Sequence, residues 1–362
     1  MPEGHSIHRI ALQFRRNFVG RRVTTSSPQG RFAAGAADLN GRELTGASAV
    51  GKHLFLEFSD TASPEDRSEP SEQPAGARIL HVHLGLYGSW DFAGDITADA
   101  TLASANGRVG QTNQHGTLLS DLASDRPFTP DALPESSLAS IGAPRLTRLR
   151  MAEQERGVDS ELPDFPPEPI GAVRVRILTD TAVADLRGPT ACEVFDQAQA
   201  EAAIAKIGPD PMHDAGKAAE DRFVTAVRKT VTPIGLLLMD QKVVAGIGNI
   251  YRAELLFRAR LNPHTPGRDI PVPTLRKLWK DWAHLLEIGV RTGQIMTKEL
   301  TTEEDWIRAL ASREERHYVY KRTGERSPRG RGTVVMEDMG GRTLYWAPGW
   351  QTGPKRREPK GE

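Results

Sequence analysis

The residues best suited to catalyse a reaction stand at the amino terminus, where Met1 is followed by Pro2, Glu3 and Gly4. Removal of Met1 would expose the secondary amine of Pro2, and because an α-amino group titrates near pKa ~8, part of it is unprotonated at neutral pH. Such an amine can attack a sugar C1′, displace the group attached there and leave an iminium. The Glu3 carboxyl could donate a proton to the opening sugar oxygen. A structural alternative stays open, because proline and an acidic residue are ordinary at a helix start.

Two later segments could bind a phosphate. Lys52 precedes an expected strand, where its ammonium could reach a phosphate or assist the sugar chemistry, although a lysine there can also be a solvated charge. Further along, Gly246 and Gly248 let the backbone turn tightly and expose its N–H groups, and Asn249 would cap the helix that follows. Amides at a helix start form a phosphate site. A plain connection between two helices is the alternative.

Composition limits the class of protein more than it identifies a partner. The 362 residues carry 47 basic and 47 acidic side chains, so any basic surface is local, as the clusters at 313–331 and 355–360 suggest. Cys192 is the single cysteine, which excludes an intramolecular disulfide and an all-cysteine zinc site. No run of about 18 apolar residues and no secretory signal pattern occurs. We therefore expect a cytoplasmic protein with no membrane partner.

Hydrophobic periodicity supplies the elements that must position these residues. Helical spacing over residues 5–18 predicts an amphipathic helix directly after the chemical residues. Alternation at period two then predicts strands at 22–26, 43–49, 53–58, 79–84, 172–178 and 182–186. The segment 93–169, rich in Ala, Ser, Gly, Asp and Pro, predicts a largely flexible insertion. Residues 1–190 should thus form an amino-terminal β-sandwich with a flanking helix.

The second half of the chain changes to helical spacing. Five amphipathic segments predict a helical domain over residues 191–300; they are 195–207, 220–229, 234–240, 250–260 and 275–292. Residues 301–351 return to a β pattern, with strands expected at 318–320, 333–336 and 343–346, and residues 352–362 form a tail. The expected fold class is therefore α+β and multidomain.

Three blocks together resemble one known family. Pro2-Glu3-Gly4, Gly51-Lys52 and the block from Met239 to Tyr251 are similar to the formamidopyrimidine-DNA glycosylase and endonuclease VIII family. The resemblance implies a bifunctional DNA glycosylase and abasic-site lyase of base excision repair, with damaged DNA as partner and a monomer as the working form. It also implies nicking by β- and δ-elimination.

The resemblance assigns a role to each block. It implies that Pro2 is the Schiff-base nucleophile, that Glu3 is the proton donor, and that Lys52 donates a proton during elimination or contacts a phosphate. The helical domain becomes a helix-two-turn-helix DNA-binding element, with Gly246, Gly248 and Asn249 at its DNA-binding turn.

Two further segments favour the endonuclease VIII branch of actinobacterial type. Residues 4–9 and 27–32 resemble that branch, which implies a preference for oxidised pyrimidines. Residues 83–88 resemble the loop that this branch inserts into the base stack, so Leu86 and Tyr87 are candidates to fill the gap left by an everted nucleotide. Packing in the core at a strand end is the alternative.

The carboxyl-terminal region departs from the family. Residues 319–325 and 341–346 resemble the flanks of a four-cysteine zinc finger, but the cysteines are absent. We expect a zincless β-hairpin finger without metal or cofactor, packed by Tyr345, Trp346 and Trp350. Arg342 stands at the hairpin tip after two glycines, and the resemblance implies that it binds the phosphates that flank the damaged nucleotide; a solvent-exposed turn arginine is the alternative.

Two other hypotheses compete with a zincless enzyme. The missing zinc ligands would also fit a catalytically inactive protein that binds damaged DNA on the same fold. A different metal held by scattered histidines such as His115 and His317 is the second alternative.

Overall fold

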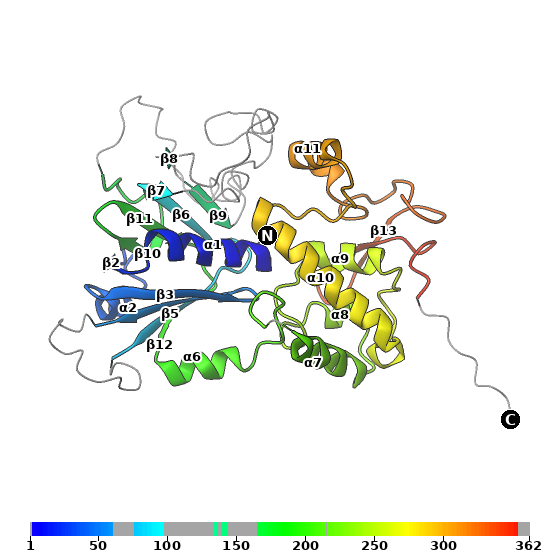
Figure 1. The fold of residues 1–362 in the computed structure, drawn as a ribbon, viewed down its shortest axis with the longest axis horizontal. Helices are drawn as coiled ribbons and strands as arrows, with labels where there is room; N and C mark the ends of the chain where they lie inside the picture. The colour runs from blue at the N-terminus through cyan, green and yellow to red at the C-terminus, as the bar shows by residue number, and fades with distance from the viewer. Residues whose placement is uncertain are drawn as a thin grey trace. The chain divides into compact units, whose positions relative to one another are not determined.

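The computed structural model describes residues 2–60, 76–97, 134–135, 139–142, 165–214 and 216–353 (Figure 1). The chain divides into two compact units. The first unit is Met1–Pro2 with Ser6–Ala205, and the second unit is Glu3–His5 with Lys206–Glu362. The short segment Glu3–His5 therefore belongs to the second unit, although its neighbours on both sides belong to the first.

Two five-stranded sheets make up most of the first unit. One sheet has the order β1 (Arg21–Arg22), β3 (Glu43–Val50), β4 (His53–Ser59), β5 (Arg78–His83) and β12 (Ala191–Phe195). The other has the order β2 (Thr24–Ser26), β10 (Val173–Leu178), β11 (Ala182–Arg187), β6 (Ser89–Gly94) and β9 (Ala139–Gly142). A small ladder of β7 (Ile96–Thr97) and β8 (Pro134–Glu135) and the helices α2 (Ala33–Leu39) and α6 (Gln197–Ile204) complete it.

One apolar core joins both sheets to α1 (Gly4–Asn17), drawn in blue in Figure 1. Apolar residues recur at helical spacing along α1 and so share one face of the helix. Ile7, Ile10 and Phe14 are all buried on that face. The Phe14 ring lies 4.9 Å from the Trp90 ring and 5.3 Å from the Phe92 ring of β6. The predicted β-sandwich with a flanking helix is confirmed.

The first unit extends past the boundary expected at residue 190. Ala191–Phe195, placed by the sequence in or before a helix, forms β12 and pairs antiparallel with β5. The expected helix begins only at Gln197, where Asp196 caps it in a capping box with Gln199. Within the segment 93–169, residues 139–142 form β9 and pair with β6, so this part is a strand of the sheet. The remaining flexibility prediction concerns residues that lie mainly outside the described ones.

Helices dominate the second unit. They are α7 (Lys217–Arg228), α8 (Ile234–Leu237), α9 (Asn249–Arg258), α10 (Val272–Thr292) and α11 (Glu303–Ala311). On α10 the buried positions follow helical spacing, and Trp282 packs edge-on against Tyr251 of α9 at 4.7 Å. The predicted helical region is confirmed. Its expected bounds differ, because α6 belongs to the first unit and α11 lies within residues 301–351, which were expected to form a β-hairpin finger. None of the helices in the described ranges is long and apolar enough to cross a membrane.

A two-stranded hairpin of β13 (Val335–Asp338) and β14 (Thr343–Trp346) lies near the carboxyl end. The prediction of a strand at residues 318–320 is wrong. The amides of Tyr318, Val319 and Tyr320 all donate to the buried carboxylate of Glu254, at 2.7–2.8 Å, and this draws the backbone into a turn. A buried carboxylate requires such donors, and that demand outweighs the β propensity of Tyr-Val-Tyr.

Candidate active site

The Glu3 carboxylate lies in a cradle of backbone amides at the start of α9. It accepts hydrogen bonds from the N–H groups of Gly248 (2.9 Å), Ile250 (2.8 Å) and Tyr251 (3.3 Å), and its side chain is fully buried. Amide donors and the positive end of a helix dipole both stabilise a carboxylate anion. The structure therefore holds Glu3 rigidly and favours its ionised form.

Two glycines are required by this close approach. Gly4 donates its N–H to the Gly246 carbonyl at 2.8 Å, and a Cβ on Gly4 would lie 2.8 Å from the Gly246 Cα. A Cβ on Gly248 would overlap the Glu3 carboxyl carbon. Gly246 and Gly248 were expected to present amides to a phosphate. The structure shows that they are needed because residues 3 and 4 pack directly against them.

The expected cap at Asn249 is wrong. Gly248 occupies the N-cap position of α9 without a side-chain cap, because the Glu3 carboxylate satisfies the first amides instead. The Asn249 side chain points to the hairpin: its amide donates to the Thr343 carbonyl at 2.8 Å and its oxygen accepts from Arg252 at 2.5 Å. The phosphate site predicted at bare helix amides is likewise contradicted for Gly248 and Ile250, whose N–H groups are committed to Glu3.

Pro2 belongs to the first unit and lines a small pocket there. The other lining residues are Ile7, Lys52, His83, Leu84 and Gly85. Lys52 reaches this pocket because Gly51 and Lys52 form the turn between β3 and β4, where Val50 pairs with His53. The structure thus brings Pro2 and Lys52 together, as the proposed amine chemistry requires.

His83 is a pocket residue that the sequence reasoning missed as a site residue. Burial lowers its pKa, and Lys52 and His81 lower it further. The neighbouring His53 has its pKa lowered to about 3, mainly by burial and then by His83. Both imidazoles are therefore neutral near pH 7, and Lys52 is the cationic side chain of this pocket. The sequence shows the alternation of His81 and His83. The pairing of β5 with β4 sets His83 opposite His53, the residue after Lys52, and His83 lines the same pocket as Pro2.

The loop between β5 and β6 presents apolar side chains to solvent. The Gly88 N–H donates to the Leu84 carbonyl at 2.9 Å and closes the turn. Leu84 is buried, whereas Leu86 is 38% and Tyr87 52% exposed. The core-packing alternative is therefore excluded for Leu86 and Tyr87, which are available to contact a partner.

Arg342 lies exposed at the tip of the β13–β14 hairpin. Gly340 (φ 67°) and Gly341 (φ 71°) occupy the two central turn positions, and Met339 N–H donates to the Arg342 carbonyl at 3.0 Å. Two left-handed residues make the type I′ turn that matches strand twist, and glycine adopts it without steric cost. The hairpin places Arg342 directly after the turn, as predicted.

Aromatic and cationic side chains pack the finger. Trp350 donates its Nε1–H to the Phe257 carbonyl at 3.0 Å, and the Arg260 guanidinium lies 4.1 Å from the Trp350 ring centroid. Tyr345 meets Tyr320 edge-on at 5.2 Å. Ala347, at the position of a missing cysteine, is fully buried. These contacts hold the hairpin region in the way that the sequence predicted for its aromatic residues.

No metal-binding cluster of three or more His, Cys, Asp or Glu side chains occurs in the part of the chain that the structure describes. His317 is buried, with its Nε2 3.1 Å from the Ile295 carbonyl and its ring edge-on to Tyr320. His115, the other histidine considered for a metal, lies outside the described residues.

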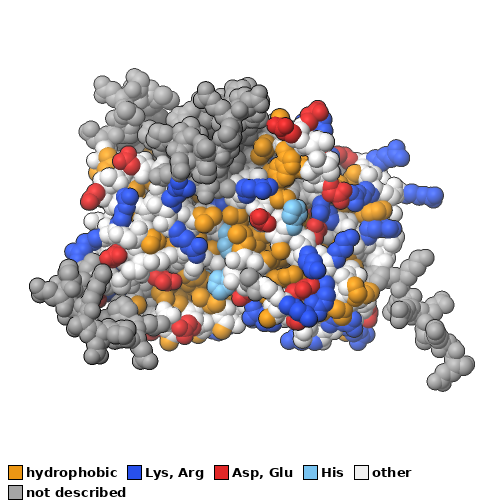
Figure 2. Space-filling model, in the orientation of Figure 1, with side chains coloured by type: hydrophobic (Ala, Val, Ile, Leu, Met, Phe, Trp, Pro, Cys, Tyr) orange, Lys and Arg blue, Asp and Glu red, His pale blue; other side chains and the backbone are white. Residues whose placement is uncertain are grey.

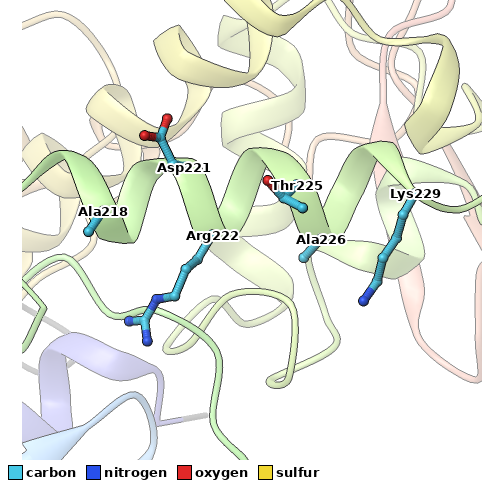
Figure 3. Close-up of a pocket in the computed structure, with 6 residues that line it drawn as sticks. All are labelled: Ala218, Asp221, Arg222, Thr225, Ala226 and Lys229. Carbon is cyan, nitrogen blue, oxygen red and sulfur yellow. The ribbon is translucent and has the colours of Figure 1, made fainter.

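The second unit also carries a basic surface. Lys and Arg side chains gather in the region of α7 and α10 on the face drawn in Figure 2. Exposed basic residues of the α7 segment include Arg222 and Lys229, and those of α10 include Lys277 and Lys280. A shallow depression of about 480 Å³ runs along α7 between Ala218 and Lys229 (Figure 3). Since Arg222 pairs with Asp214 at 2.9 Å, charge there is partly compensated, and we assign the depression no chemistry.

Comparisons with known proteins agree with this geometry. Residues 1–123 match the formamidopyrimidine-DNA glycosylase N-terminal domain, and residues 207–301 match the formamidopyrimidine-DNA glycosylase H2TH domain. Endonuclease 8 1 of Mycobacterium tuberculosis is 35% identical over 353 residues, covering 97% of this chain and 100% of the relative. Formamidopyrimidine-DNA glycosylase of Thermus thermophilus is 30% identical over 146 residues, covering 40% of this chain and 53% of that protein.

A similar fold occurs among solved structures. The complex between the Lactococcus lactis Fpg and an abasic site containing DNA has a TM-score of 0.59 at 16% identity, covering 96% of this chain and 98% of that one. The β-sandwich, the helical unit and the two matched domains define an enzyme of the DNA glycosylase and abasic-site lyase class. The chain belongs to the formamidopyrimidine-DNA glycosylase and endonuclease VIII family, and its full-length relative places it on the endonuclease VIII side. It is a DNA glycosylase of oxidative-damage repair.

Proposed function

We propose that this enzyme excises oxidised pyrimidines through a covalent intermediate on Pro2 and then nicks the strand by β- and δ-elimination. The observation that carries the proposal is the pocket that Pro2 shares with Lys52, together with the amide cradle that fixes the adjacent residue, Glu3. An amine beside a cation is kept in its unprotonated, nucleophilic form more readily than an isolated one.

The covalent step needs the Pro2 amine, the Glu3 carboxylate and solvent water. The Pro2 nitrogen bonds to C1′, the bond from C1′ to the base breaks, and the base leaves with the bonding electrons and takes a proton from water. Opening of the sugar ring requires a proton at O4′, and the nitrogen lone pair then forms the iminium. Water takes the acidified C2′ proton, and the 3′ phosphate leaves with the electrons of its C–O bond. Loss of a second proton to water expels the 5′ phosphate in the same way.

Glu3 enters this sequence as an anion. Since its cradle stabilises the carboxylate, we propose that it first accepts the proton that the Pro2 amine loses and then donates that proton to O4′. The proton-donor role is retained, but the proton comes from the nucleophile. Lys52, in the Pro2 pocket, supplies a proton during elimination or neutralises the departing phosphate.

Asn249 and Arg342 are the proposed phosphate contacts. An asparagine amide has two N–H groups, so the bond to the Thr343 carbonyl leaves one for a phosphate oxygen. The Arg342 guanidinium, on an exposed turn, can bind a phosphate in bidentate fashion. The monomeric and cytoplasmic state expected from the sequence stays a prediction.

Product analysis on defined duplexes tests the activity and the role of the β5–β6 loop. A duplex with one oxidised pyrimidine should be cut faster than one with an oxidised purine, leaving phosphates on both sides of the gap. Leu86→Ala should slow excision by about tenfold, because the wedge offsets part of the few kcal/mol that unstacking costs. Val231→Ala, at another exposed apolar residue, is the control and should change nothing. Faster cutting of the purine lesion would overturn the pyrimidine preference.

We propose that the finger works without a metal, since Trp350, Arg260 and Phe257 supply its packing. Exhaustive chelation should leave both the melting temperature and the nicking rate unchanged. Trp350→Ala should lower the free energy of unfolding by ~3 kcal/mol, at the lower end for tryptophan truncation, while Trp350→Phe should lose much less. Calorimetry and elemental analysis check this, and stoichiometric metal that survives dialysis would contradict it.

A further inference from the structure

A single buried guanidinium connects the start of α9 to the β13–β14 hairpin. Arg252, one turn after Asn249, is fully buried. Its Nη2 donates to the Asn249 side-chain oxygen at 2.5 Å and to the Arg342 and Thr343 carbonyls at 3.4 Å. Its Nη1 donates to the Met339 carbonyl at 3.2 Å. All of these acceptors lie in the second unit, and three of them surround the hairpin turn.

Burial of this charge has a clear cost and a specific compensation. Desolvation lowers the pKa of Arg252 to about 10, so the group still carries its charge at neutral pH. A buried cation requires acceptors, and here the acceptors are carbonyl groups at the hairpin turn and the amide of Asn249. An apolar residue could fill the space but could not orient the Asn249 amide, whose oxygen it would leave without its charged donor.

The two residues proposed to hold phosphates thus share one support. The Asn249 amide is fixed at its oxygen by Arg252 and at its nitrogen by the Thr343 carbonyl. The backbone of Arg342 is fixed by Arg252 and by the Met339 amide. A lysine at position 252 would keep the charge but could not span acceptors on two elements with a planar fork.

We propose that Arg252 is a positioning residue that holds Asn249 and the Arg342 hairpin as one preorganised phosphate-binding unit. The inference rests on the proposed function, in which Asn249 and Arg342 contact DNA. Arg252 itself touches no DNA in this proposal, and it acts only through the two residues that it orients.

A double-mutant cycle tests the inference. Binding of the full chain to a duplex with a tetrahydrofuran abasic analogue would be measured for Asn249→Ala, Arg252→Lys and the double variant. Arg252→Lys alone should weaken binding by about tenfold, as expected when a charge-assisted hydrogen bond is lost. The two losses should not add: in the Asn249→Ala background Arg252→Lys should cost less than in the native enzyme, because only the Arg342 hairpin is then left for the guanidinium to hold. For Arg252→Lys, the plot of the logarithm of the binding constant against the logarithm of the salt concentration should become shallower by the slope that about one phosphate contact contributes.

Arg258→Lys is the matched control. Arg258 lies on the same helix, and its guanidinium is also anchored, by Asp281 at 2.6 Å and 2.7 Å and by the Thr297 carbonyl. Arg258→Lys shows how far DNA binding weakens when any anchoring guanidinium is lost from this helix. Its effect should be small and should add to the effect of Asn249→Ala. Comparable melting temperatures for the two lysine variants would separate positioning from stability.

The outcomes distinguish the inference from the proposed function. Losses that are additive in the Arg252–Asn249 cycle, on top of a real effect of Asn249→Ala, would overturn the inference alone. Unchanged binding by both Asn249→Ala and Arg342→Ala would overturn the phosphate contacts themselves, and the inference with them.

Discussion

Glu3→Gln is expected to lose base excision by a factor of ~10²–10⁴, the usual contribution of a positioned acid–base group. A glutamine can neither accept the proton of the Pro2 amine nor return it to the sugar oxygen. It also places an NH₂ group among amides that donate to Glu3 in the native enzyme. Cleavage at a preformed abasic site should survive in large part, because that sugar opens to its aldehyde form without a proton from Glu3. Single-turnover rates on the two substrates measure this difference.

Glu254→Gln is the control for Glu3→Gln. The Glu254 carboxylate is also fully buried and also accepts backbone amides, from Tyr318, Val319 and Tyr320. The same substitution there should reduce stability and leave the ratio of the two rates unchanged. Normal excision by folded Glu3→Gln would remove Glu3 from the mechanism.

An enzyme with a blocked amino terminus is expected to lose excision and lyase activity together. Retained Met1, or a two-residue extension before Pro2, converts the secondary amine into an amide that is not nucleophilic. Pro2→Gly should keep part of the activity, because a primary amine remains after Met1 is removed. Mass spectrometry of each preparation gives the state of the terminus, and DNA binding that persists in the blocked form excludes misfolding. Turnover by a fully blocked enzyme would contradict the amine mechanism.

The sequence could predict that residues 246–249 needed tight backbone turns, but not what approached them. Glycines at Gly246 and Gly248 signal a close contact, and a phosphate was one reasonable partner. The actual partner of the Gly248 amide is Glu3, which lies far away in the sequence. Such a contact is set by tertiary packing, so local patterns could not distinguish a bound phosphate from a side-chain carboxylate.

Two local errors have the same origin. The segment Ala191–Phe195 alternates too weakly to predict a strand, because β12 is the last strand of its sheet and leaves Glu193 exposed. Residues 318–320 have strong β propensity but are held by Glu254. In contrast, α1, α10 and the β10–β11 hairpin follow their hydrophobic periods closely, because each places one face against a core.

Borohydride trapping tests the central claim, that the Pro2 amine forms the covalent intermediate, most directly. Enzyme shown by mass to lack Met1 would be incubated with duplex DNA carrying an abasic site or an oxidised pyrimidine, and then reduced. We expect a stable adduct in which the DNA fragment is attached to Pro2, and no adduct from the enzyme with a blocked amino terminus. No adduct from an enzyme that binds the same DNA, or an adduct on Lys52 in place of Pro2, would contradict that claim and, in the first case, favour a protein that only binds damaged DNA.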